Sequence, residues 1–310
     1  MTPPAHKTSG IVSRPSNPVP GVLDQYCRTA YHLFMSKPLV GTCGWSYDDW
    51  LGPFYPPGTP ANEYLARYAE QFKIVEVDSS FYRIPSVAMT RRWADQTPDD
   101  FRFTLKFPQV ITHEKRLADC NEELEHLGSA IAPLGAKLHC LLVQLGYFNK
   151  QAFATPGTFY KRLDEFLGRL PKDWPVAVET RNKDFLRPDF FDVLRSHGTS
   201  TAVADQVWMP PIPEMLDRFD LLTGPLLYVR LIGDREGIEK ITTKWDKVVV
   251  DRSEQIAAIV KSLARVMPKT QLAAFINNHY AGYGPAIAKA FLDEMSKVMG
   301  HGTAKVGRRK

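Results

Sequence analysis

The sequence predicts an α/β protein that folds as one (β/α)8 barrel of the TIM type. Three observations indicate this fold: eight short β-rich segments, amphipathic helical segments between them, and no glycine-rich GxGxxG or Walker loop. Doubly wound sheets usually have fewer strands and carry such a loop after the first strand, so the barrel is the better interpretation. A chain of 310 residues, 44% of them hydrophobic, can bury a large core.

The predicted strands are short segments rich in β-branched, leucine and aromatic residues. In chain order they are Leu39–Cys43, Ile74–Val77, Phe101–Phe107, Leu138–Leu145, Val176–Glu179, Thr199–Ala204, Leu226–Leu231 and Gln271–Ile276. In the third strand, the period of two places the phenylalanines on one face and Thr104 with Lys106 on the other. We therefore expect Lys106 to point into the barrel and the phenylalanines to face the helices.

Helical segments lie between these strands and carry hydrophobic residues three and four positions apart. That spacing places the hydrophobic side chains on one helix face, which would pack on the outside of the sheet. Such stripes are Leu65, Tyr68, Ala69 and Phe72; Leu124, Leu127, Ile131 and Leu134; Phe159, Leu163, Phe166 and Leu170; and Ile256, Ile259, Val260 and Leu263.

The two ends of the chain differ in composition from its body. Residues 1–38 contain six prolines among serine, threonine and asparagine, which predicts a disordered extension before a barrel over residues 39–300. Residues 301–310 form a basic tail. The extension carries a net charge of +3 and the tail +4, which leaves −2 for the barrel out of a total of +5. A duplex-binding body usually has an excess of lysine and arginine, so nucleic acid is a disfavoured partner.

The sequence also indicates the compartment. No apolar run approaches the roughly 18 residues that span a bilayer, and the N-terminus lacks a charged segment followed by an apolar core. The four cysteines are widely spaced without a CxxC pair, which is typical of reduced thiols. We expect a cytoplasmic protein with no membrane partner, and the sequence leaves its oligomeric state open.

Polar residues gather where the predicted strands end, and in a barrel these ends build the active face. Glu76, Glu179, Asp205 and His113 are the candidate catalytic groups because carboxylates and histidine exchange protons. The candidate binding residues are cations, amides and aromatic residues of the same loops, namely Lys106, Arg181, Arg230, Asn277, Asn278, Tyr82, Arg83, Trp45 and Gln144. Asp78 lies two residues after Glu76, on the same strand face.

Two other interpretations of these residues stay open. The acids and bases could form a neutral buried network, or cap the following helices, without any chemistry. Glu179, Asp205, His113 and His279 could instead hold a divalent metal ion, but no compact motif such as HExxH supports a metal, and no motif for a nucleotide cofactor is present.

The sequence resembles the YecE family, also called domain of unknown function 72. The motifs that carry this resemblance over residues 39–292 are GTCGWSYDDWLGPFYP at 41–56, VEVDSSFYRIP at 75–85, RWADQTPDDFRFTLKFPQVITH at 92–113, VQLGYF at 143–148, AVETRN at 177–182, YVRL at 228–231 and FINNHYAGYGPAIA at 275–288. The resemblance implies a TIM-type barrel but no particular reaction. It implies recurrent polar positions at Glu76, Ser80, Tyr82, Arg83, Lys106, Thr112, His113, Gln144, Glu179, Arg181, Asp205, Arg230, Asn277 and Asn278.

The leading functional hypothesis is an enzyme, a hydrolase or an isomerase or lyase, that acts on a small phosphorylated or carboxylated substrate. In it, Lys106, Arg181 and Arg230 hold the anion and Glu179 or Glu76 acts as general acid or base. One alternative is metal-assisted cleavage of phosphodiester bonds in nucleic acid, helped by the basic tail. The other is a non-catalytic barrel that binds a ligand or regulates a partner.

Overall fold

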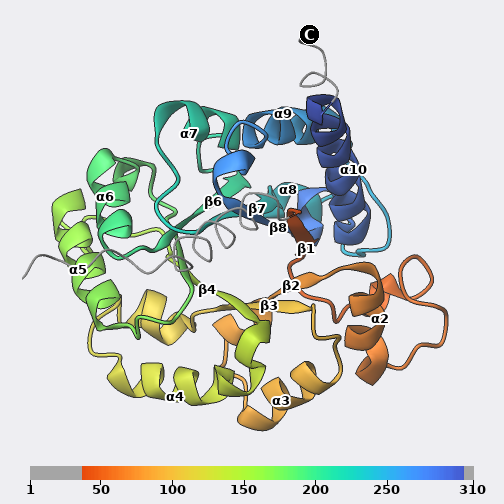
Figure 1. The fold of residues 1–310 in the computed structure, drawn as a ribbon, viewed down its shortest axis with the longest axis horizontal. Helices are drawn as coiled ribbons and strands as arrows, with labels where there is room; N and C mark the ends of the chain where they lie inside the picture. The colour runs from red at the N-terminus through yellow and green to blue at the C-terminus, as the bar shows by residue number, and fades with distance from the viewer. Residues whose placement is uncertain (1–36, 304–310) are drawn as a thin grey trace, which may run out of the picture.

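The structure is a computed structural model that describes residues 37–303, with side chains up to residue 299 (Figure 1). Most of the proline-rich extension predicted for residues 1–38 lies outside the described residues, and so do residues 304–310 of the predicted basic tail. The last helix reaches Thr303, three residues into that predicted tail. In the described part of the chain, no helix is long and apolar enough to cross a membrane.

Eight parallel strands form the central sheet, with the hydrogen-bonded order β1-β8-β7-β6-β5-β4-β3-β2. They are β1 Leu39–Thr42, β2 Ile74–Val77, β3 Arg102–Lys106, β4 Leu138–Gln144, β5 Val176–Glu179, β6 Ser200–Gln206, β7 Leu226–Gly233 and β8 Gln271–Ile276. All eight predicted strands are confirmed, with ends that differ by two residues at most. The architecture is a (β/α)8 barrel, as the sequence predicts.

Helices surround the strands, as Figure 1 shows. They are α2 Tyr64–Gln71, α3 Val87–Asp95, α4 Asn121–Ile131, α5 Pro156–Arg169, α6 Pro188–Ser196, α7 Ile212–Arg218, α8 Arg235–Glu239, α9 Ser253–Leu263 and α10 Gly284–Thr303. The predicted hydrophobic stripes form the buried faces of α2, α4, α5 and α9, except that Phe72, Leu134 and Leu170 lie just past the ends of their helices. Only Asp234 separates the end of β7 from the five residues of α8.

The core has two parts, one between strands and helices and one inside the barrel. Strand β3 shows how sequence alternation divides them. Phe103 faces outward onto Trp93 of α3, with ring centroids 6.2 Å apart, whereas Thr104 faces inward, with its hydroxyl 2.9 Å from that of Tyr228. The inner part is filled by alanine, cysteine and branched aliphatic residues together with Tyr228 and Phe275, whose rings stack at 4.6 Å. Lys106 follows Thr104 on the inner face, which confirms its predicted direction.

The barrel closes between β1 and β2 through a side chain from α2. Thr42 N donates to the Tyr68 hydroxyl at 2.8 Å, and that hydroxyl donates to the Ile74 carbonyl at 3.0 Å. Gly41 permits this close approach, because a Cβ there would lie 2.0 Å from the Ile74 carbonyl oxygen. Beyond this point the strands meet directly, where Gly44 N donates to the Glu76 carbonyl at 2.8 Å. The closure therefore fixes the position of Glu76 at the end of β2.

We expect Tyr68→Phe to lower the free energy of unfolding by about 1–3 kcal/mol, because the Thr42 amide and the Ile74 carbonyl would be left buried without a partner. Urea denaturation of the purified variant measures this loss. The matched control is Tyr64→Phe on the same helix, whose hydroxyl meets the Asp48 side chain at 3.1 Å in a partly buried position. Equal losses in both variants would contradict a special role for Tyr68 in closure.

Candidate active site at the barrel mouth

The carboxyl ends of the strands surround a pocket of about 780 Å³. Residues at or after the ends of the eight strands line it, from Tyr47 after β1 to His279 after β8. Of the residues predicted from the sequence, the pocket wall contains Tyr82, Lys106, His113, Gln144, Arg181, Arg230, Asn277, Asn278 and His279. The volume falls within the range of small-molecule sites.

Arg230 forms the floor of the pocket and is only 2% exposed. Its guanidinium binds both oxygens of Glu76, at 2.9 and 2.7 Å, and donates to Glu179 at 2.8 Å. Tyr228, two residues earlier on the same strand face, donates to Glu76 at 2.7 Å. Barrel interiors are usually filled with branched aliphatic residues, so a buried arginine with two carboxylates is an unusual layer.

Glu76 and Glu179 are held ionised by this layer. Burial works to raise the pKa of Glu76, but the charges of Arg230 and Lys106 and the hydrogen bonds from Arg230 and Tyr228 lower it below its usual range. Burial also works to raise the pKa of Glu179. The charges of Arg230 and Arg181 outweigh the effect of burial and lower that pKa. Neither carboxylate lines the pocket. The structure thus places both predicted catalytic glutamates beneath the floor, as counter-ions of Arg230.

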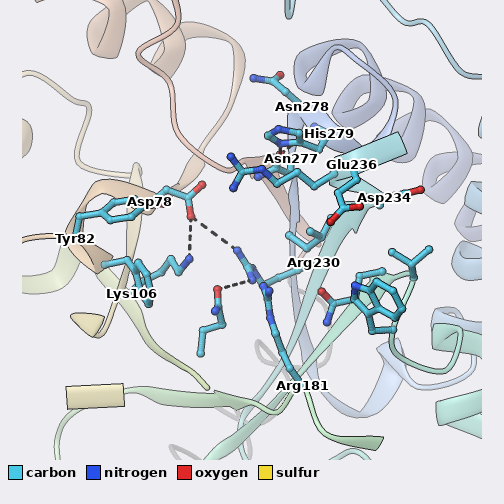
Figure 2. Close-up of a pocket in the computed structure, with 18 of the residues that line it drawn as sticks. Asp78, Tyr82, Lys106, Arg181, Arg230, Asp234, Glu236, Asn277, Asn278 and His279 are labelled. Carbon is cyan, nitrogen blue, oxygen red and sulfur yellow. Dashed lines mark hydrogen bonds and ion pairs between the residues drawn. The ribbon is translucent and has the colours of Figure 1, made fainter. Parts of the chain in front are cut away.

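Asp78 is the carboxylate that reaches the pocket (Figure 2). Its Oδ1 lies 3.4 Å from Lys106 Nζ and 3.8 Å from the Arg230 guanidinium, and 29% of its side chain is exposed. Burial and the neighbouring charge of Glu76 raise the pKa of Asp78, and this outweighs the opposing effect of Lys106 and Arg230. A carboxyl group with a raised pKa can both release and accept a proton near neutral pH.

Ser80 fixes Asp78 and Lys106 relative to each other. Asp78–Phe81 form a short 3-10 turn after β2, and the Ser80 hydroxyl in that turn accepts a hydrogen bond from Lys106 N at 2.9 Å. The same hydroxyl lies 2.7 Å from the Val77 carbonyl. The ammonium of Lys106 sits 4.6 Å from the centre of the Phe81 ring. These contacts tie the loop after β2 to β3 and hold the charged pair at the pocket edge.

A cationic wall on the side of β3 to β5 is formed by Lys106 and Arg181, with His113 beside them. Arg181 contacts Glu179 through Nε at 3.2 Å, and within residues 37–303 its two terminal amino groups have no partner. His113 stands on a π-helical turn, Val110–Glu114, and bonds to the Thr112 hydroxyl at 2.8 Å. Burial together with the charges of Arg181 and Lys106 lowers the pKa of His113. The wall therefore combines the ammonium of Lys106 and the guanidinium of Arg181 with an imidazole whose neutral form is favoured.

The side of the pocket that follows β7 and β8 carries amides and carboxylates. Figure 2 shows Asp234 and Glu236 across the pocket from Lys106 and Tyr82. Both ring nitrogens of His279 have partners, since Nδ1 lies 2.7 Å from Asn277 Oδ1 and Nε2 lies 3.0 Å from Glu239. His279 is consequently held in place and has no free nitrogen for a metal ion.

Besides Glu76 and Glu179, three further predicted site residues do not line the pocket. Asp205 faces the helix layer and accepts from the Tyr280 hydroxyl at 3.0 Å. Strand β6 continues to Gln206, so alternation turns Gln206 rather than Asp205 into the mouth. Trp45 packs edge-on against Trp93 of α3, with centroids 5.5 Å apart, and Arg83 is exposed outside the pocket.

The catalytic and binding residues predicted from the sequence leave out several pocket residues, above all Asp78, Gln206 and Trp208. For Asp78 a signal was present, because its spacing from Glu76 places both side chains on one strand face. For Trp208 the sequence holds no comparable signal, because it follows a strand whose end was placed two residues too early.

The predicted metal ligands are not brought together. Within the described residues, the one cluster of histidine, cysteine and carboxylate groups that could share an ion is Cys43, Glu76 and Asp78, whose ligand atoms lie within 4.8 Å of one another. These residues fit a metal poorly. Glu76 already pairs with Arg230, and burial with the neighbouring carboxylates raises the pKa of the Cys43 thiol, which opposes the thiolate that a metal needs.

A family of proteins of unknown function, DUF72, matches residues 39–307. The chain belongs to the DUF72 family. Among DUF72-related proteins, the UPF0759 protein YecE of Escherichia coli K12 is 31% identical over 150 residues, which cover 47% of this chain and 49% of that protein. The UPF0759 protein YunF of Bacillus subtilis is 27% identical over 192 residues, which cover 58% and 66%. The chain thus spans about half of the first relative's length.

Solved structures of DUF72 proteins share this fold. The protein from Thermotoga maritima has a TM-score of 0.67 and 24% identity, covering 85% of this chain and 99% of that one. The protein from Enterococcus faecalis has a TM-score of 0.62 and 22% identity, covering 85% and 96%. These likenesses establish the barrel, and the chemistry of the mouth has to be argued from the residues of this chain.

Proposed function

We propose that this DUF72 protein is an enzyme that binds a small phosphorylated or carboxylated substrate in the mouth pocket. The substrate's anionic group binds to Lys106 and Arg181, and Asp78 transfers the proton. The observation that carries the proposal is the Arg181 guanidinium, which faces the pocket with its terminal amino groups unpartnered among the described residues. A planar guanidinium with two free amino groups fits the two oxygens of a carboxylate or phosphate.

The charge of the barrel mouth supports an anionic substrate. Three cations, Lys106, Arg181 and Arg230, face three carboxylates, Glu76, Asp78 and Glu179. The raised pKa of Asp78 leaves part of its population protonated near neutral pH, and these six groups then have a net positive charge. An anion bound nearby raises that pKa further, because like charges oppose ionisation. Binding thus prepares Asp78 to act as a general acid.

The buried layer below the pocket gives Arg230 and its partners a positioning role. Arg230 donates to Gln144 at 3.3 Å as well as to the two glutamates, so its guanidinium is fixed on several sides. A fixed positive charge in a site of low polarity stabilises negative charge that develops during a reaction more effectively than a mobile one. This is the physical reason for placing the chemistry above Arg230.

A thermal-shift panel tests the anion site. We expect wild-type protein to be stabilised by phosphorylated or carboxylated metabolites and not by their uncharged counterparts, because a ligand at ~100 times its Kd adds roughly 2.7 kcal/mol. Arg181→Gln should lose this stabilisation. The matched control, Arg187→Gln, changes an exposed arginine of the same loop that lies outside the pocket, and it should respond like wild type. Equal stabilisation of both variants by the anions would contradict the proposal.

A further inference from the structure

We propose that the mouth pocket contains a second subsite, formed by Gln206, Trp208 and Asn278, that binds a flat ring carrying hydrogen-bond acceptors. The substrate class is then an anion joined to a heteroaromatic ring, as in nucleotides. This inference rests on the proposed function for the position of the anionic group, and it adds the identity of the group attached to the anion.

Trp208 presents a large apolar surface to the pocket. It lines the pocket wall although 72% of its surface is exposed, and its neighbour Val207 is 55% exposed. Tyr82, which follows β2, is 71% exposed and lines the same pocket. Exposed aromatic side chains at the edge of a concave site are typical surfaces for stacking on a ring. Tyr147 is equally exposed, at 75%, but does not line the pocket, so it offers a natural comparison.

An irregularity at the end of β6 brings these residues to the mouth. Asp205 pairs with Leu231 but the next residue, Gln206, pairs with Gly233, so one residue of β7 is skipped. Met209 N then donates to the Gln206 carbonyl at 3.1 Å, which closes a turn with Val207 and Trp208 at its tip. The side chain of Met209 is 8% exposed and anchors that turn. Bulges of this kind re-aim side chains and are frequent beside active sites.

Two buried amide donors at the pocket lack acceptors. Within the described residues, neither Gln206 Nε2 nor Asn278 Nδ2 has a hydrogen-bond partner, although the two residues are only 8% and 3% exposed. The orientation of Asn278 is set by its other end, because its Oδ1 accepts from Gly284 N at 2.8 Å. Buried donors are nearly always paired in folded proteins, so a ligand atom that accepts from them would complete the site.

A heteroaromatic ring suits both the exposed surface of Trp208 and the two unpartnered amide donors. Its ring nitrogens and carbonyl oxygens accept hydrogen bonds from amide NH2 groups, and its face stacks on tryptophan. A sugar ring is puckered and its hydroxyls donate as readily as they accept, so it matches a flat surface and two unpaired donors less well. The pocket of about 780 Å³ has room for a ring in addition to the anion.

Calorimetric titrations with four probes test this subsite: adenosine 5′-monophosphate, adenosine, glucose 6-phosphate and inorganic phosphate. We expect the nucleotide to bind wild type at least about tenfold more tightly than phosphate or glucose 6-phosphate. Trp208→Ala should weaken nucleotide binding by at least about fivefold, near the lower limit for removing a stacking aromatic residue, and leave phosphate binding unchanged. Gln206→Leu should have a similar selective effect, and Tyr147→Ala should have none.

The outcomes separate the subsite from the anion site. If phosphate binds as tightly as the nucleotide, or glucose 6-phosphate binds as tightly, the ring subsite is refuted while the anion site stands. If adenosine binds and depends on Trp208 while phosphate does not bind, the ring subsite stands and the anion site is refuted. If Tyr147→Ala weakens the nucleotide as much as Trp208→Ala does, binding lies on the outer surface and the subsite is refuted.

Discussion

Replacing Arg230 by alanine should lower the free energy of unfolding by about 3–5 kcal/mol, the usual loss when one partner of a buried ion pair is removed. The variant would leave Glu76 and Glu179 buried, 0% and 1% exposed, without their main counter-ion. Urea denaturation at neutral pH measures the loss. The matched control is Arg235→Ala, an exposed arginine of the same mouth that pairs with Glu239, for which we expect a loss below about 1 kcal/mol.

A triple variant tests the electrostatic origin of this loss. Arg230→Met combined with Glu76→Gln and Glu179→Gln removes the charges on both sides, so it should recover a large part of the stability. If Arg230→Ala unfolds as easily as Arg235→Ala does, the buried layer is not the charged cluster described above. If the triple variant is no more stable than Arg230→Ala, loss of packing rather than unpaired charge explains the effect.

Asp78→Asn should stabilise the fold at neutral pH by about 1–3 kcal/mol while it removes the proton-transfer group. The folded protein holds the Asp78 proton more tightly than the unfolded chain does, since burial and Glu76 raise the pKa from 3.8 to about 6. Wild type therefore loses stability as the pH rises from about 4 through this raised pKa. Asparagine mimics the protonated form, so the gain should be absent near pH 4 and complete above about pH 7.

Denaturation curves of wild type and Asp78→Asn over this pH range measure the difference. Glu236→Gln, which changes an exposed carboxylate of the same pocket, is the matched control. A destabilised Asp78→Asn variant at pH 7 would mean that the ion pair with Lys106 at 3.4 Å outweighs burial. Asp78 would then be an ordinary salt-bridge partner with no tuned proton affinity.

The fold follows from local patterns because each strand and helix carries its own periodicity. Strand β3 is an example, with outward Phe103 and inward Thr104 both set by alternation. Strand ends are less well determined, because they depend on pairing with the neighbouring strand. The two extra residues of β6 decide that Gln206 faces the mouth and Asp205 does not. No local pattern in the sequence contains that information.

The site could be predicted as a set of residues but not as a set of roles. The sequence places Glu76, Lys106, Glu179 and Arg230 at neighbouring strand ends. In the structure Arg230 pairs with Glu76 and Glu179, and Lys106 pairs with Asp78. Which carboxylate reaches the pocket depends on depth within the barrel, a property of the assembled layers. Glu76 lies one layer below Asp78 and is enclosed by Arg230 and Tyr228. The carboxylate two positions later, on Asp78, therefore lies in the pocket wall.

One measurement tests the central claim that the mouth turns over an anionic substrate. Purified wild type, Asp78→Asn and Arg181→Gln are each incubated with a cellular extract of small molecules, and mass spectrometry identifies the compounds that are consumed. We expect wild type to consume a phosphorylated or carboxylated compound. Asp78→Asn should convert that compound at least about 100-fold more slowly, as expected for loss of a general acid or base. Arg181→Gln should also convert it poorly. If both variants consume that compound as fast as wild type, or if every compound that binds is recovered unchanged, the mouth is not the proposed active site.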